Sequence, residues 1–510
     1  MRINVSKLFF ASLIISAQSA LFSQQVTVLT LDKSIDIALE ESYSIKSIKQ
    51  LVYSAERNLW AARAGYKTYA QSKMYAPVYD EGFKLIEVVE GNPVAKQTGS
   101  YQVRGTFDLI QPMPWIPFGG GSLTFRAEGY RLNSWTPSLA DPGIDIKSNQ
   151  FYSSLSAIVE KPLFTINELK LGLQQAELNY ERQSKVFKRS ELDLVYQVTR
   201  SFYQLYRRAQ ELEINREKVE RQEMIYNTTQ KKFKAGLAAE VEAMQAEVEL
   251  VQYQNDLKSS ESRKKEQEAA FKQLIGLPLS STISVMTDLE LKPVIVDQEQ
   301  AVELALNNRS EIVEKLIDIE EQKINIKEID ARVSVKGNIK GYYRFAGFSD
   351  AAIPYGATTE DLFNSSWDVL KQTPNRGVTF ELEIPVWDWG KNRAQVQAAE
   401  ATLQRHQLIL DDTYVTIKRE VQDLVRSVYE TYDRVTMLEK NREVSEKSFN
   451  ISLQRYQNGD ITPTDLARAN DQLNTAKLSY LSAYIEYKLS LADLQRKTLY
   501  DFETKRSLVE

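Results

Sequence analysis

Residues 391–458 hold neither glycine nor proline, and from Leu410 to Leu438 apolar residues recur in alternating steps of four and three, interrupted only at Thr431. This spacing places one apolar stripe along a helix and is typical of coiled-coil packing. At ~1.5 Å per residue the helix would be on the order of 100 Å long, so it needs a partner along its whole length. The stripe, called the apolar seam below, consists of Leu410, Tyr414, Ile417, Val421, Leu424, Val428, Val435 and Leu438.

A second long stretch, residues 173–235, has the same composition and also lacks glycine and proline. Each stretch ends at a short break, and a second helical pattern follows at about 240–275 and 464–500. Gly236 and Gly459 suit the left-handed position that ends a helix. The sequence therefore predicts two helical hairpins, and one further helix opening each half at about 31–64 and 298–331. The equivalent stripe in the first half consists of Leu194, Val198, Leu205 and Leu212, and it is interrupted by polar residues at Glu191, Ser201 and Arg208.

Between the predicted helices the spacing of apolar residues changes from one every 3.5 residues to one every two. Val378, Phe380 and Leu382 alternate with polar residues, which predicts strands with one apolar and one polar face. Two strong strands are predicted in each half, four in all. Residues 66–118 carry a similar alternation and predict an additional hairpin, whose place in the fold stays open. The other alternating runs begin at Ile339, Leu123 and Leu155.

The chain matches itself when it is shifted by 223 positions. This offset places Pro162 opposite Pro385, and Gly236 opposite Gly459. Upstream the offset grows to 267, so the first half carries about 44 extra residues. We therefore expect two structural repeats, 24–290 and 291–510, with the inserted hairpin at about 66–118.

Residues 1–23 read as a secretory signal peptide, with Arg2 and Lys7 before an apolar run and small residues at its end. Cleavage is expected after Ala20 or Ser23. The chain has no cysteine, which excludes disulfides and thiolate metal sites. Its net charge of -5 offers no excess of positive charge for a nucleic acid partner. The residues after the leader contain no apolar run of about 18, so a membrane would have to be crossed as a β-barrel.

The sequence offers no catalytic constellation. Its single histidine, His406, lies among glutamines and leucines in the second long stretch. No Ser/His/Asp order, zinc-binding HExxH motif or phosphate-binding loop is present. We expect no enzyme, no cofactor and no metal site.

Four strands are too few to close a barrel, because the smallest barrels hold about eight. Three chains of four strands would close a twelve-stranded barrel, and the same symmetry would wrap the long helices into a tunnel. An exported coiled-coil structural protein is the alternative that the helices alone would support.

Paired segments and turns in this order resemble the TolC-like outer-membrane efflux proteins. The segments are 160–177 and 383–400, where a strand ends at proline and a helix begins; the turns lie at Gly236 and Gly459. The resemblance implies a mixed α and β membrane protein: a homotrimeric, twelve-stranded barrel in outer-membrane lipid, continuing into a long periplasmic coiled-coil tunnel. It also implies a periplasmic adaptor, an inner-membrane transporter and efflux of small molecules, with type I protein secretion as the alternative.

The resemblance also suggests roles for particular residues. Gly236, Leu237 and Gly459 match the adaptor-docking turns, although they also serve as helix stops. Glu242, Tyr456 and Asp465 match the periplasmic constriction, where Tyr456 would bond to Glu242 and three copies of Asp465 would favour cations. Solvated acids on a helix face are the alternative for both carboxylates. Two positions depart from the family pattern, namely Ile461 and Arg468.

Overall fold

The structure, a computed structural model, describes residues 27–88, 91–117, 119–138, 144–287, 291–350, 353–370 and 374–508. The leader expected at 1–23 lies outside these residues. The chain divides into two compact units. The helical unit comprises Met1–Tyr53, Arg182–Leu316 and Leu408–Glu510, and the sheet unit comprises Ser54–Glu181 and Ile317–Gln407.

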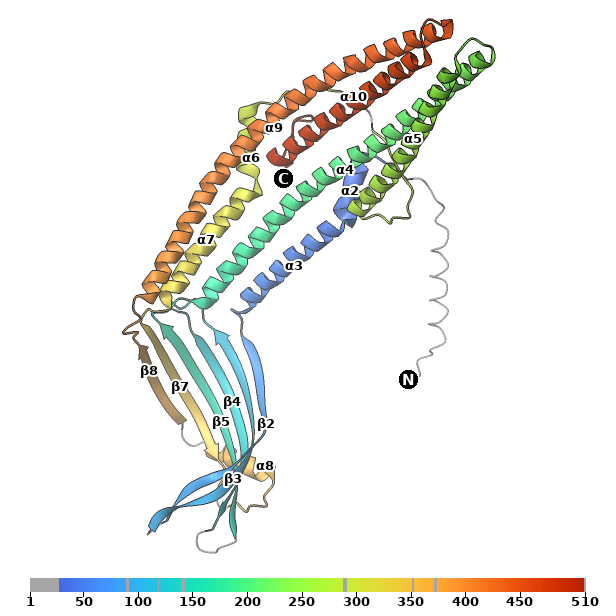
Figure 1. Cartoon of the computed structure of the whole chain (residues 1–510). Helices are drawn as coiled ribbons and strands as arrows, with labels where there is room; N and C mark the ends of the chain where they lie inside the picture. The colour runs from blue at the N-terminus through green and yellow to red at the C-terminus, as the bar shows by residue number, and fades with distance from the viewer. Residues whose placement is uncertain are drawn as a thin grey trace, which may run out of the picture. The chain divides into compact units, whose positions relative to one another are not determined.

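Two very long helices dominate the chain and confirm the expected extents. Helix α4 spans Glu168–Lys234 and folds back on α5, Glu240–Ile275. Helix α9 spans Lys391–Asn458 and folds back on α10, Pro463–Thr498. Figure 1 shows these two hairpins with their tips next to each other. No helix in the described ranges combines the length and the apolar character needed to span a bilayer.

The helices that open each half are shorter than expected. Single helices at 31–64 and 298–331 were the prediction, and it is wrong at one point in each. The chain instead forms α2, Leu31–Glu41, then α3, Tyr43–Ala64; and α6, Gln298–Asn308, then α7, Ser310–Ala331. Ser42 and Arg309 break the helices because both have an extended ψ, of 133° and 126°. Arg309 is 6% exposed and pairs with the nearby Glu311 and with Glu420 of α9, so one tertiary ion pair helps to override helix propensity there.

Most of the apolar seam of α9 packs in the core of the helical unit, whereas Tyr414 is 38% exposed. Ile417, Val421 and Val435 are at most 2% exposed. They share one cluster with Leu194 and Val198 of α4. Burial of these stripes accounts for the packing of two helices whose other faces are charged. The cluster is completed by large side chains of α10, chiefly Tyr480, Tyr484, Tyr487, Leu491 and Leu494.

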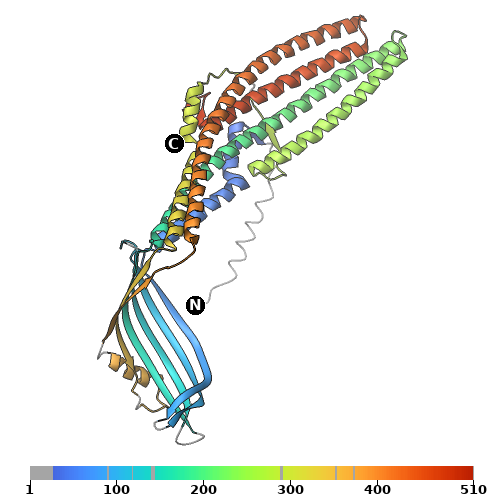
Figure 2. The ribbon, with the colours of Figure 1, turned by 60° about the vertical axis from the view of Figure 1, so that its left-hand side comes forward.

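The sheet unit contains a single six-stranded sheet, ordered β2-β3-β4-β5-β7-β8 with every neighbour antiparallel. Figure 2 shows the strands side by side. The sheet thus contains the four expected strands and, as β2 and β3, the additional hairpin predicted at about 66–118. The strands span Tyr69–Val88 (β2), Gly91–Pro112 (β3), Ser122–Pro137 (β4), Asp145–Leu163 (β5), Lys336–Phe348 (β7) and Pro374–Glu383 (β8).

The extra strands join the sheet because their alternation matches that of their neighbours. Residues paired across antiparallel strands point to the same face. Leu109 pairs with Phe125, Phe125 with Ala157, and Ala157 with Tyr343, which makes one continuous apolar face. The opposite, polar face carries Asp108, Arg126, Glu128, Lys340, Arg344 and Glu381.

A short helix that the sequence did not reveal, α8 at Thr359–Leu370, packs on the apolar face of the sheet. Its Ser366 Oγ lies 2.6 Å from Ser153 Oγ and 3.2 Å from the Gly347 carbonyl oxygen. A Cβ on Gly347 would lie 1.9 Å from the Ser366 carbonyl, so glycine permits this contact. Short pairings complete the fold: β1, Thr27–Leu29, with β6, Ile283–Val285; and β9, Tyr500–Asp501, with β10, Arg506–Ser507.

Candidate functional site

The two hairpin tips share one turn geometry. After α4, the Gly236 amide donates to the Phe233 carbonyl and the Leu237 amide to that of Lys232. After α9, the same two bonds run from Gly459 to Tyr456 and from Asp460 to Arg455. These are Schellman motifs, which require a left-handed residue after the helix. Gly236 and Gly459 supply it with φ of +76° and +89°.

The tips are open to a partner. No atom outside the immediate backbone lies within 4 Å of a Cβ built on Gly236 or Gly459. The apolar side chain of Leu237 is 78% exposed. An exposed leucine beside a rigid turn is a suitable contact for another protein, because burying its surface would be favourable.

Tyr456 links α9 to α4. It is 3% exposed and packs with Ile225 and Phe449. Its hydroxyl lies 2.8 Å from Oγ1 of Thr229, so the bond expected with Glu242 is replaced by one with Thr229. Thr229 points toward α9 from within α4, whereas Glu242 lies in the first turn of α5.

The surroundings of Tyr456 keep it neutral. Burial raises its pKa, and the nearby charge of Glu242 acts in the same direction, while the bond to Thr229 lowers it. Lys232 Nζ lies 4.4 Å from the ring centroid and donates to the Tyr456 carbonyl at 3.0 Å. Lys232 and Thr229 are thus partners of the tyrosine that the sequence analysis missed.

Asp465 caps the N-terminus of α10 and also carries a negative charge. It forms a capping box at the start of α10, where Thr462 Oγ1 lies 2.8 Å from its Oδ2. This hydrogen bond lowers the pKa of Asp465 and keeps it ionised. Arg468, one of the departures from the family pattern, lies 4.0 Å from the other carboxylate oxygen. Ile461, the other departure, packs against the core cluster that includes Tyr456.

A polar network farther along the hairpins ties α4 to α10. Arg221 donates to the side-chain oxygens of Asn470 and Asn474, both at 2.7 Å. Its remaining nitrogen pairs with Glu217 at 3.2 Å, and Lys477 pairs with the same carboxylate at 2.8 Å. These five residues are called the Arg221 network. Asn470 is fully buried, so the network replaces apolar packing at this level.

Next to the Arg221 network, a second group of polar contacts joins α4 and α5 to α10. Lys218 Nζ lies 2.7 Å from Asp471 Oδ1 and 3.7 Å from the centroid of the Tyr253 ring. The Tyr253 hydroxyl donates to the same oxygen of Asp471 at 3.1 Å. Asp471 of α10 is therefore bonded to both helices of the first hairpin.

The polar face of the sheet is held together by ion pairs. Arg126 donates twice to Asp108, at 2.6 and 2.9 Å, and Asp108 is 1% exposed. Arg104 pairs with Glu128 at 2.5 Å on the same face. A sheet with one charged and one apolar face can separate an aqueous lumen from lipid.

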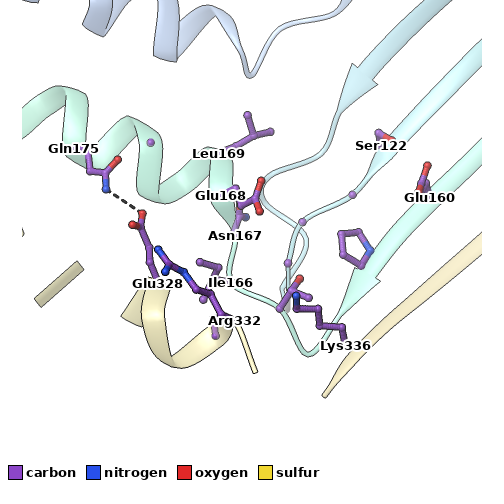
Figure 3. A pocket seen from close by; sticks show the side chains of 17 residues that line it. Ser122, Glu160, Ile166, Asn167, Glu168, Leu169, Gln175, Glu328, Arg332 and Lys336 are labelled. Carbon is purple, nitrogen blue, oxygen red and sulfur yellow. Dashed lines mark hydrogen bonds between the residues drawn. The ribbon is translucent and has the colours of Figure 1, made fainter. Parts of the chain in front are cut away.

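A cavity of about 750 Å³ lies in the sheet unit where β4, β5 and α4 approach α7. Figure 3 shows Gln175 bonded to Glu328, at 3.0 Å, beside Arg332. Asn167 donates to the Pro114 carbonyl at 2.7 Å and so fastens the proline-rich loop to the start of α4. The described residues contain no group of three or more acidic, histidine or cysteine side chains that could hold a metal ion.

The chain matches the family model for outer membrane efflux proteins over residues 129–277 and 364–498, which together exceed half of its length. Comparison with curated proteins returns no significant match.

Solved structures share the fold. A membrane protein from Pseudomonas aeruginosa is 16% identical, with a TM-score of 0.67 and coverage of 92% of each chain. The CmeC outer membrane channel of Campylobacter jejuni is 13% identical, with a TM-score of 0.67 over 94% of this chain and 87% of that chain. The MtrE outer membrane channel of Neisseria gonorrhoeae, solved in its open state, is 14% identical, with a TM-score of 0.63 over 94% and 91%. The chain therefore belongs to the outer membrane efflux protein family, the TolC-like channels of the outer membrane, and is not an enzyme.

Proposed function

We propose that three copies of the chain form an exit duct for small molecules, with a closed barrel in the outer membrane and a helical tunnel in the periplasm. The observation that carries this proposal is the two-faced sheet. Its apolar face exposes large side chains such as Phe125, Val378 and Phe380, at 51%, 79% and 57%. Unpaired strand edges are not tolerated in hydrocarbon, so such a sheet must be closed by further copies.

Exposed apolar stripes on the helices support assembly as well. On α9, Met437, Val444 and Ile451 are spaced by seven residues and are 72%, 53% and 58% exposed. On α5, the exposed set is Val241, Met244, Val248 and Val251. Stripes with this spacing become buried when helices of neighbouring copies pack as coiled coils. A single copy would leave them in water.

At the tips, Gly236, Leu237 and Gly459 would dock a periplasmic adaptor that connects the duct to an inner-membrane transporter. Glu242, Tyr456 and Asp465 would lie at the constriction. Three copies of Asp465 would place ionised carboxylates around one axis and attract cations, with Arg468 reducing the effect. The Arg221 network would hold the two hairpins of each copy together while the duct is closed.

The proposal is tested on the full-length protein purified in detergent from outer membranes. We expect a trimer by native mass spectrometry, a band on unheated SDS gels that heating converts to monomer, and low conductance in planar bilayers. Asp465→Asn should shift the reversal potential in a salt gradient toward lower cation preference. A monomer that needs no detergent and gives no conductance would overturn the proposal.

A further inference from the structure

We propose that the barrel wall contains eighteen strands, because β8 of one copy pairs with β2 of the next and all six strands of each sheet take part. This inference rests on the trimer proposed above and concerns the surface through which the copies meet. The partner is a second copy of this chain. Two strand edges carry the argument.

The hairpin of β2 and β3 covers the edge of β4. In a barrel with four strands per copy, a neighbouring copy would pair with that edge. β3 pairs with β4 continuously from Gly99 opposite Trp135 to Pro112 opposite Ser122. β2 then pairs with β3 from Tyr69 opposite Ile110 to Val88 opposite Gly91. Of the strands in this sheet, β2 and β8 are the two that lack a second neighbour. A copy could reach β4 only by displacing the whole hairpin.

Strand direction permits the new pairing. β2 starts and β8 ends at the same end of the sheet. At this end Tyr69 of β2 pairs with Ile110 of β3 on one edge, and Glu383 of β8 pairs with Lys336 of β7 on the other. Each chain contributes an even number of antiparallel strands. β8 and the next β2 therefore run antiparallel, and the alternation continues around the barrel.

The faces also match across the junction. Aligning the end of β8 with the start of β2 places Leu382, Phe380 and Val378 beside Ala70, Ser72 and Met74. Both sets lie on the apolar face according to the pairing within the sheet. Met74 and Val378 are 80% and 79% exposed in a single copy, and the new pairing would cover part of both.

Charges on the polar face complement each other at the same junction. Lys73 of β2 lies on this face, as do Glu381 and Glu383 of β8. In this alignment Thr379 lies directly opposite Lys73, and Glu381 is the diagonal neighbour of Lys73, a distance that a long side chain can span. No like charges face each other in this alignment of Tyr69–Tyr75 with β8.

A barrel of this size has a consequence for transport. Barrels of 16–18 strands leave an aqueous channel through the membrane. The wall would then be too wide to select solutes, and selection would fall on the helical tips.

Cysteine cross-linking tests the inference cleanly because the chain has no cysteine of its own. Phe380→Cys is combined in turn with Ala70→Cys, Ser72→Cys and Met74→Cys of β2, and the full-length trimer is oxidised in outer membranes. We expect at least one of these pairs to give covalent dimers and trimers on non-reducing SDS gels. The positions lie at opposite edges of one sheet, so the products must join different copies.

Two control pairs use the same Phe380→Cys variant. Leu123→Cys of β4 reports the twelve-stranded arrangement, and Lys73→Cys reports the polar face, which should not cross-link. A Leu123 product without any β2 product would overturn the eighteen-stranded wall and leave the trimeric duct intact. A heat-labile trimer without either product would also overturn it. Loss of the trimer in the cysteine-free parent would instead refute the proposed function.

Discussion

The hydroxyl of Tyr456 lies 2.8 Å from Oγ1 of Thr229, and this bond joins α9 to α4 beneath the hairpin tips. Thr229 in turn donates to the Ile225 carbonyl at 2.8 Å. Both side chains are buried, so neither can exchange the bond for water. The two hairpins of one copy are therefore fastened to each other close to the turns proposed to meet the adaptor.

Removing this bond should loosen the tips. Tyr456→Phe keeps the ring and its packing but deletes the hydroxyl, and we expect a loss of about 1 kcal/mol in the free energy of unfolding. A double-mutant cycle with Thr229→Val, measured by denaturant unfolding in detergent, should give a coupling energy of about 1 kcal/mol. Thr436→Val is the control, because its hydroxyl bonds only to the Tyr432 carbonyl of its own helix. Additive effects would show that the bond contributes nothing.

The Arg221 network should contribute more than any exposed ion pair. Arg221→Ala leaves the Asn474 oxygen without the guanidinium donor and the Asn470 oxygen with only the 3.4 Å bond from Asn474 Nδ2, so we expect a loss of about 2 kcal/mol in stability. If the network holds the duct closed, the variant should also raise the single-channel conductance. Arg216→Ala is the matched control: Arg216 is 51% exposed, pairs with Glu213 one turn away and should cost under about 1 kcal/mol. Equal effects of the two substitutions would contradict this ranking.

Glu217 and Glu249 should give stability opposite dependences on pH. Partial burial acts to raise the pKa of Glu217, but hydrogen bonds from Lys477 and Arg221 outweigh it and the pKa is lowered. Its stabilisation is therefore present above the unfolded pKa of about 4.3 and is lost as the pH falls through the folded value. Burial raises the pKa of Glu249, so ionisation of this residue costs stability as the pH rises.

The measurement is the unfolding temperature between pH 7 and pH 3. Glu217→Gln should lower it at pH 7 and reduce the loss on acidification. Glu249→Gln should raise it at pH 7, because an uncharged amide replaces a poorly solvated carboxylate. Parallel curves for both variants and the parent would show that neither group is linked to folding.

The glycine turns should be sensitive to a single methyl group. Gly236→Ala or Gly459→Ala forces an L-residue into the left-handed region, at a cost of roughly 1–2 kcal/mol to the turn. Gly172→Ala is the control: this glycine lies inside α4 with no neighbour within 4 Å of a Cβ, so the change should be neutral or stabilising. Leu237→Asp should leave folding unchanged yet weaken co-purification of the adaptor. Undiminished co-purification would argue against docking at Leu237.

The sequence predicted the long helices well because few forces compete with their pattern. Neither glycine nor proline interrupts 391–458, and the seven-residue period continues through Val421 and Val435, which are fully buried. The breaks at Ser42 and Arg309 were not predicted because the residues on both sides of each break favour an α-helix. Helix α8 was not predicted because twelve residues are too few to show a long periodic run of apolar positions.

Partner choice was harder to predict than the elements themselves. Whether Tyr456 contacts Thr229 or Glu242 depends on how α4 and α5 are rotated about their axes. The members of the Arg221 network lie up to 260 residues apart, as in the bond from Lys477 to Glu217. Isolated polar residues on a helix also resemble a solvated face. Asn470 and Asn474, four residues apart on an otherwise apolar face of α10, are the one signal that could have revealed it.

The hairpin of β2 and β3 occurs in the first half of the chain without a counterpart strand pair in the described part of the second half. In a threefold assembly of identical chains, one insertion in a single gene would enter the wall three times. Pore width could then evolve only in large steps, whereas substitutions in the helices would tune the tips gradually. Strand number and tip chemistry would thus respond to selection on different scales.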